Sequence, residues 1–185
     1  MPTSPSPPST AGYTFVTGGA RSGKSSLAVR LAHASGRAVT FVATGEALDD
    51  EMTERIARHR DERPANWHTV EAPLLLVDAL QRTDSDSFVI VDCLSLWVSN
   101  LMLDRVDGVR DIETQAGHLQ RVLMERPSPS VVVTNEVGLG IVPDNALARS
   151  FRDVLGRVNA IVAGGAEDAF VVVAGRVIRL DMPPV

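Results

Sequence analysis

The stretch "TFVTGGARSGKSSLAVRLA", residues 14–32, decides the fold class of this 185-residue chain. An apolar run leads into the pattern G-x-x-x-x-G-K-S, from Gly18 to Ser25, and a helical pattern follows. Glycines let the backbone turn its N–H groups toward phosphate oxygens, and the next helix adds its positive end. A glycine turn before an ordinary helix is the alternative. The flanking strand and helix favour a phosphate-binding loop, or P-loop.

Two side chains of this loop have predicted roles with a nucleotide. Lys24 should reach the β- and γ-phosphates, and the Ser25 hydroxyl should ligate Mg²⁺. A P-loop also needs an acidic residue at the end of a neighbouring strand. "FVIVD", residues 88–92, supplies Asp92 in that position. Asp92 could instead cap the helix that follows. We favour the metal role, because the P-loop requires such a partner.

The remaining pattern alternates short apolar runs with helical segments. Continuous apolar runs are typical of strands buried on both faces of a parallel sheet. The predicted strands are 13–17, 38–43, 88–92 and 130–135, and the predicted helices 23–33, 49–62, 94–103, 111–125 and 143–162. Pro143 suits a first helical position, and Gly164-Gly165 suits a helix exit. "AFVVVAGRVIRL", residues 169–180, predicts a hairpin. The pattern predicts a three-layer α/β domain with a mostly parallel sheet and an antiparallel C-terminal pair.

Composition limits the function class. We expect one domain over residues 13–185, after a disordered Pro- and Ser-rich tail over 1–12. The net charge of −5 argues against a nucleic-acid partner. No stretch approaches the roughly 20 apolar residues that cross a bilayer, and the N-terminus does not resemble a signal peptide. The single cysteine, Cys93, fits a reducing compartment, so we expect a cytoplasmic protein with a buried structural thiol.

The segment "EMTERIARHRDERP", residues 51–64, places His59 among several arginines. His59 shares a helical stripe with Met52 and Ile56. It could be a partly buried helix residue beside a solvated charged face. Alternatively, it could be a nucleophile toward a nucleotide phosphorus, kept neutral by the nearby positive charges. The residues of this segment alone leave the two possibilities equal.

The chain resembles a known family, the bifunctional adenosylcobinamide kinase/adenosylcobinamide-phosphate guanylyltransferases of cobalamin biosynthesis. The similarity covers nearly all of residues 14–180. It is carried by "TGGARSGKS" (17–25), "ATGEALDDEM" (43–52), "RIARHRDERPANWHTVE" (55–71), "VTNEVGLGIVP" (133–143) and "LARSFRDVLGRVN" (147–159). The resemblance implies phosphorylation of adenosylcobinamide by ATP or GTP, then transfer of GMP from GTP to the new phosphate. It also implies a RecA-like P-loop domain that assembles as a homotrimer.

The resemblance also implies a set of site residues. It places a GMP-histidine intermediate at His59 and, with the P-loop and Asp92, favours the nucleophile over the solvated face. Nucleotide contacts are implied at Gly18, Gly19, Ala20, Arg21, Ser22, Gly23, Lys24, Ser25, Ala43, Thr44, Gly45, Arg60, Asp61, Glu62, Arg63, Glu71 and Asp92. Ser25 and Asp92 are the predicted metal ligands. For the glycine loop in 133–143, the resemblance favours a site loop over a strand-end turn, with no individual role derived for Asn135 or Glu136.

Two other function classes share the P-loop. One is a small-molecule kinase without nucleotidyl transfer. The other is a RecA-like ATPase or a nucleotide-dependent binding module. The acidic chain contains only 4% aromatic residues, which argues against work on nucleic acid.

Overall fold

The computed structural model describes residues 11–46, 54, 60, 63–104 and 109–182. A seven-stranded sheet with the order β3-β2-β4-β5-β1-β6-β7 forms its centre. The pairs among the first six strands are parallel, and β7 runs antiparallel to β6. The strands are β1 (Tyr13–Gly18), β2 (Val39–Ala43), β3 (His68–Glu71), β4 (Phe88–Asp92), β5 (Ser130–Val133), β6 (Asp168–Val173) and β7 (Arg176–Arg179).

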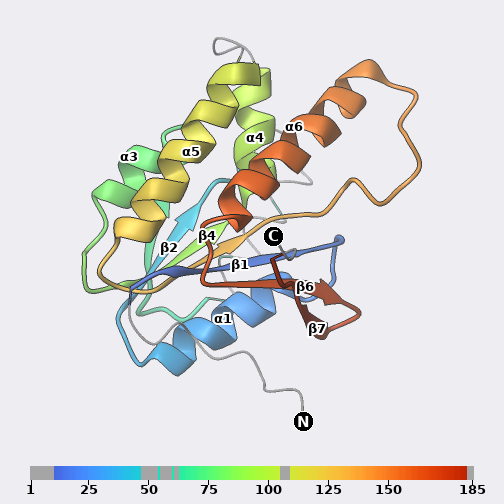
Figure 1. The fold of residues 1–185 in the computed structure, drawn as a ribbon. Helices are drawn as coiled ribbons and strands as arrows, with labels where there is room; N and C mark the ends of the chain where they lie inside the picture. The colour runs from blue at the N-terminus through green and yellow to red at the C-terminus, as the bar shows by residue number, and fades with distance from the viewer. Residues whose placement is uncertain (1–10, 47–53, 55–59, 61–62, 105–108, 183–185) are drawn as a thin grey trace.

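Helices cover both faces of this sheet (Figure 1). Helix α1 lies alone on one face, and the other described helices pack on the opposite face. These helices are α1 (Lys24–Ser35), α3 (Leu76–Gln81), α4 (Leu94–Leu103), α5 (Val109–Glu125) and α6 (Ala146–Ala163). The predicted three-layer α/β fold, with a mostly parallel sheet and an antiparallel C-terminal pair, is confirmed.

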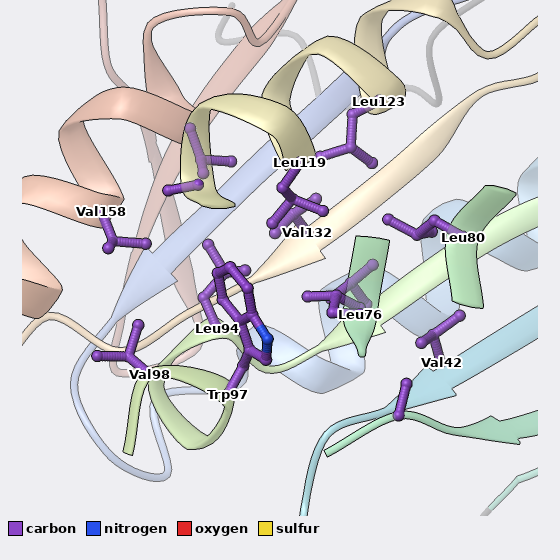
Figure 2. Close-up of a cluster of buried hydrophobic side chains, with 14 of the residues drawn as sticks. Val42, Leu76, Leu80, Leu94, Trp97, Val98, Leu119, Leu123, Val132 and Val158 are labelled. Carbon is purple, nitrogen blue, oxygen red and sulfur yellow. The ribbon is translucent and has the colours of Figure 1, made fainter. Parts of the chain in front are cut away.

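Two apolar clusters hold the layers together. On the α1 face, Leu27 and Leu31 pack with Phe41 and Ile90 of the sheet. On the other face, fully buried Trp97 lies at the centre of a larger cluster (Figure 2). Its indole Nε1 donates to the Leu74 carbonyl at 3.0 Å, so its one polar atom is satisfied within the core.

The sequence predictions match most elements and miss two. The four predicted strands, the C-terminal hairpin and the helices following Gly23 and Cys93 are present. Strand β3 and helix α3 were not predicted. The predicted start of the fifth helix at Pro143 is wrong, because α6 begins at Ala146. There the Asn145 side chain accepts from the N–H groups of Leu147 and Ala148, and this cap fixes the helix start.

Other predictions fall outside the described residues. Most of the predicted 49–62 helix does so, as do residues 1–10 of the predicted tail. Among the described helices, none combines the length and the apolar character that crossing a membrane requires.

Candidate functional site

The predicted site residues converge because parallel strands end at one edge of the sheet. The register aligns Glu71 with Ala43, Ala43 with Asp92, and Asp92 with Val133. Val133 aligns in turn with Val16, two residues before the P-loop begins. Segments far apart in the chain are thereby brought to a common edge. Ligands of open α/β sheets bind at the carboxyl ends of their strands.

The P-loop leaves β1 at this edge in a conformation that demands glycine. At Gly18, φ is +145°, and an added Cβ would lie 2.3 Å from the Val172 carbonyl oxygen. Gly23 caps α1 with φ of 104°. The hairpin between β6 and β7 supports the loop, since the Gly175 N–H donates to the Ser22 carbonyl at 2.9 Å. The loop shape is therefore fixed by the last two strands.

Lys24, the predicted phosphate-binding residue of the loop, bonds to the loop backbone in this structure. The Lys24 ammonium, largely buried, donates to the Gly19 carbonyl at 2.7 Å. Gly19, Ala20 and Arg21 are exposed, and Ser22 is buried. Such a lysine can move to a phosphate when one enters the loop.

The Ser25 hydroxyl donates to Asp92 Oδ2 at 2.9 Å. These residues lie 67 positions apart in the chain. The alternative for Asp92, capping of the next helix, is not observed. Helix α4 begins after Cys93, and within the described residues no side chain caps it. Two adjacent hard oxygen donors fit Mg²⁺, which takes one or two protein ligands and fills the rest of its shell with water and phosphate oxygens.

Thr44, at the end of β2, is fully buried and bound to the backbone beyond β4. Its hydroxyl donates to the Cys93 carbonyl at 2.7 Å and accepts from the Cys93 N–H at 2.8 Å. Its own carbonyl accepts from the Asn100 amide at 2.8 Å. The Thr44 side chain therefore holds the chain beside Asp92, while its neighbours Ala43 and Gly45 are half-buried.

The arginine segment reaches the same edge. The Arg63 guanidinium stacks on the Phe41 ring, 3.6 Å from its centroid, and Arg60 pairs with Glu71 at 3.9 Å. Burial is the main cause that lowers the pKa of Arg63. Among the neighbouring charges, Asp92 raises this pKa, Arg60 lowers it and Glu71 raises it. Arg63 therefore interacts electrostatically with both the Asp92 carboxylate and the Arg60–Glu71 pair.

The predicted residues His59, Asp61 and Glu62 lie outside the described residues. The first described residue after His59 is Arg60, whose guanidinium approaches the end of β3. Trp67, which follows the arginine segment, is partly buried against the core. Trp67 packs against the α1-face cluster and contacts the His33 ring, with centroids 5.3 Å apart.

The segment after β5 was expected to be a site loop, with no individual role for Asn135 or Glu136, and the structure brings both residues to the P-loop edge. Strand β5 lies between β1 and β4. The Asn135 amide donates to the Ser95 hydroxyl at 2.9 Å, and the Glu136 N–H donates to the Gly18 carbonyl at 3.1 Å. The signal in the sequence was the polar pair directly after a buried strand, but the strand order was needed to interpret it.

Two other features lie apart from the P-loop. Cys93 is buried, as predicted, and burial raises the pKa of its thiol to about 11. A cavity of about 730 Å³ lies along β3 and α3, and its lining includes His68, Val70 and Leu74. None of the P-loop residues line this cavity. We place the candidate site at the sheet edge, because the Ser25–Asp92 contact lies there.

Comparison with known proteins gives a consistent result. Residues 14–180 match the family model described as cobinamide kinase / cobinamide phosphate guanyltransferase. The bifunctional adenosylcobalamin biosynthesis protein CobP of Pseudomonas aeruginosa is 43% identical over 174 residues, covering 91% of this chain and 95% of its own length. The protein CobU of Salmonella typhimurium, with the same description, is 41% identical over 174 residues, covering 87% of this chain and 95% of its own length.

Solved structures with lower similarity were also found. The RadB recombinase aligns with a TM-score of 0.49 and 17% identity, covering 86% of this chain and 73% of its own. The flagellar accessory protein FlaH of Methanocaldococcus jannaschii aligns with a TM-score of 0.49 and 16% identity, covering 90% of this chain and 74% of its own.

Proposed function

Since this chain belongs to the cobinamide kinase / cobinamide phosphate guanyltransferase family, we propose how its residues divide the two reactions. The protein is a bifunctional enzyme of cobalamin biosynthesis, a cobinamide kinase and a cobinamide-phosphate guanylyltransferase. The small-molecule kinase without nucleotidyl transfer and the RecA-like ATPase are therefore set aside.

In the kinase reaction, the loop from Gly18 to Ser25 holds the triphosphate of ATP or GTP. The observation that supports this assignment is the 2.9 Å contact between the Ser25 hydroxyl and the Asp92 carboxylate, directly beside Lys24. Ser25 and Asp92 would hold Mg²⁺, which neutralises charge on the β- and γ-phosphates. Lys24 leaves the Gly19 carbonyl and binds the phosphate to be transferred. The acceptor is the aminopropanol hydroxyl of adenosylcobinamide.

In the guanylyltransferase reaction, His59 is the nucleophile. One imidazole nitrogen forms a bond to the α-phosphorus of GTP, and the bond from that phosphorus to the pyrophosphate oxygen breaks. The phosphate of adenosylcobinamide-phosphate then attacks the GMP-histidine, which releases neutral His59 and gives adenosylcobinamide-GDP. Arg60 and Arg63 would stabilise the negative charge on the transferring group. The contact of Arg60 with Glu71 and the electrostatic coupling of Arg63 to Asp92 support a common site.

Labelling with GTP that carries ³²P at the α-phosphate tests the nucleophile. Wild-type protein with Mg²⁺ should acquire covalent label that is acid-labile and alkali-stable, as phosphoramidates are. His59→Ala should acquire none and keep its kinase activity. His118→Ala, which changes a histidine on α5, is the matched control and should label normally. Covalent label that persists in His59→Ala refutes the assignment.

A second measurement tests the P-loop. Lys24→Ala should lower transfer of the γ-phosphate to cobinamide by about 100-fold or more, because the lysine stabilises charge in the transition state. If Lys24→Ala instead keeps kinase activity within about threefold of wild type, the phosphate site lies elsewhere.

We also propose a homotrimer in the cytoplasm. The segment between β5 and α6 exposes apolar side chains that a subunit contact would cover. Leu139 is 89% exposed and Ile141 97%, with Val142 and Leu147 also exposed. Contiguous exposed apolar residues mark interaction surfaces. Light scattering should give three times the 19.8 kDa chain mass, and Ile141→Asp should lower it.

A further inference from the structure

The kinase reaction needs a group that accepts the proton of the substrate hydroxyl. We propose that this base is Glu136, which lies beyond the end of β5. The proposal rests on the P-loop as the phosphate site. It adds a catalytic residue that the assignments above do not contain.

Strand order places Glu136 beside the first glycine of the P-loop. Because β5 lies between β1 and β4, the chain leaving β5 emerges between the P-loop and Asp92. Beyond the strand, backbone hydrogen bonds hold the chain against β1. The Thr134 N–H donates to the Val16 carbonyl at 2.9 Å, and the Glu136 N–H donates to the Gly18 carbonyl at 3.1 Å. Glu136 is therefore held against the first glycine of the phosphate loop.

Asn135, the residue before Glu136, is held by hydrogen bonds to α4 and α6. The Asn135 amide donates to Ser95 in the first turn of α4, and its carbonyl accepts from the Asn159 amide at 3.0 Å. The short segment that carries Glu136 is thereby fixed between β1, α4 and α6. A base must be positioned within hydrogen-bond reach of the hydroxyl, which favours a fixed segment over a free loop.

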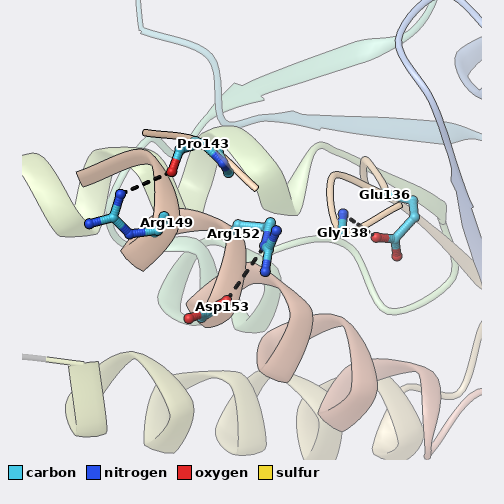
Figure 3. A network of polar contacts seen from close by, with 6 residues as sticks. All are labelled: Glu136, Gly138, Pro143, Arg149, Arg152 and Asp153. Atoms are coloured by element: carbon cyan, nitrogen blue, oxygen red, sulfur yellow. Dashed lines mark hydrogen bonds and ion pairs between the residues drawn. The ribbon is translucent and has the colours of Figure 1, made fainter. Parts of the chain in front are cut away.

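Glu136 is half-buried, and its carboxylate bonds to the backbone two residues further along. Its Oε1 accepts from the Gly138 N–H at 2.6 Å (Figure 3). Two arginines of α6, also drawn in Figure 3, have other partners. Arg149 donates to the carbonyls of Pro143 and Asp144, and Arg152 pairs with Asp153 at 3.6 Å. Within the described residues, no arginine forms an ion pair with Glu136, so no such pair holds its carboxylate away from a substrate hydroxyl.

The other described carboxylates at this edge fit the role less well. Asp92 accepts from Ser25 and belongs to the metal site. Glu71 pairs with Arg60 and lies on β3, which β2, β4 and β5 separate from β1. Glu46 is exposed and lies beyond β2, which β4 and β5 separate from β1. Glu136, in contrast, lies just beyond β5, which is a direct neighbour of the P-loop strand β1.

The proposed step conserves atoms and electrons. The substrate hydroxyl oxygen bonds to the γ-phosphorus, and the bond between that phosphorus and the oxygen bridging to the β-phosphate breaks. ADP or GDP leaves with the electron pair. The hydroxyl proton passes to the Glu136 carboxylate and then to solvent.

The second reaction has no use for this base. Its acceptor is a phosphate monoester, whose second pKa is about 6, so the attacking oxygen carries no proton near neutral pH. Loss of the base should therefore separate the two activities of one protein. A purely structural role for Glu136 would impair both.

Glu136→Gln is the test variant, because an amide oxygen can still accept from Gly138 but the side chain cannot take a proton. We expect γ-phosphate transfer to cobinamide to fall about 100-fold or more. Covalent GMP labelling, and GMP transfer to cobinamide-phosphate supplied directly, should stay within about threefold of wild type. Glu136→Asp keeps a carboxylate and should retain more kinase activity than the Gln variant. Glu46→Gln is the matched control and should leave both reactions intact.

Three results would overturn the proposal. In the first, Glu136→Gln keeps kinase activity within about threefold of wild type. In the second, Glu136→Gln lowers the kinase and guanylyltransferase activities equally, and in the third, Glu136→Asp and Glu136→Gln lose kinase activity equally. Lys24→Ala distinguishes a failure of this proposal from a failure of the P-loop assignment on which it rests. If that variant loses kinase activity while Glu136→Gln does not, the P-loop assignment stands and only the base is wrong.

Discussion

Substitution of Thr44 tests how the chain beside Asp92 is held in place. Thr44→Val keeps the shape of the side chain and removes only its hydrogen-bonding capacity. In the wild-type protein, this fully buried hydroxyl satisfies both backbone groups of Cys93, the residue after Asp92.

The cost depends on what each Cys93 group loses. The Cys93 carbonyl keeps a second donor, the Trp97 N–H at 3.2 Å, so it loses one bond worth about 1 kcal/mol. The Cys93 N–H loses its hydroxyl acceptor in a site closed to water, which costs about 1–3 kcal/mol. We therefore expect Thr44→Val to lower the free energy of unfolding by about 2–4 kcal/mol.

Thr14→Val is the matched control. Thr14 is also fully buried, and within the described residues its hydroxyl has no hydrogen-bond partner. Replacing that hydroxyl by a methyl group should leave stability unchanged or raise it by about 1 kcal/mol.

Urea unfolding of both variants, followed by circular dichroism at one fixed protein concentration, measures the two differences. Equal effects of the two substitutions, or a loss below about 1 kcal/mol for Thr44→Val, would refute the reasoning.

Three further predictions concern other parts of the structure. Gly18→Ala should cost at least about 2 kcal/mol of unfolding free energy, because the new Cβ would meet the Val172 carbonyl oxygen at 2.3 Å. Gly19→Ala, with open space around its Cβ, should cost much less in the same urea experiment. Asn145→Ala removes the N-cap of α6 and should cost about 1 kcal/mol, whereas Asn145→Asp should largely preserve stability. Burial raises the pKa of Cys93 from 9.0 to about 11, so the unfolded chain loses this proton first. The contribution of protonated Cys93 to the free energy of unfolding is complete below about pH 9. It should fall by up to roughly 2–3 kcal/mol as the pH rises toward about 11. Cys93→Ser should lack that fall.

Local patterns in the sequence predicted much of this protein. The P-loop could be recognised because its glycines, lysine and serine lie in one short run, from Gly18 to Ser25, between a strand and a helix. The buried strands could be recognised because both faces of each are apolar. The position of Asp92 beside Ser25 was also predictable, because a P-loop requires a carboxylate at a strand end.

Segments that depend on distant partners were missed. Strand β3, "HTVE", has only four residues, which are exposed or half-buried, and it forms because β2 offers a free edge. Helix α3 has six residues and is held by Leu76 and Leu80 in the core. The fifth helix was placed too early, because Pro143 suits a first turn and the stronger Asn145 cap lies further along the chain.

The sequence by itself determined which residues could bind phosphate and metal, because that chemistry depends on residue types at short spacing. Only the tertiary structure decided which strands are neighbours. The order β4-β5-β1 brings Glu136 to the first glycine of the P-loop and lets Asp92 meet Ser25 across 67 positions. Strand order results from packing between segments far apart in the chain, and no short pattern encodes it. The proposed base could therefore be inferred only from the strand order of the folded sheet.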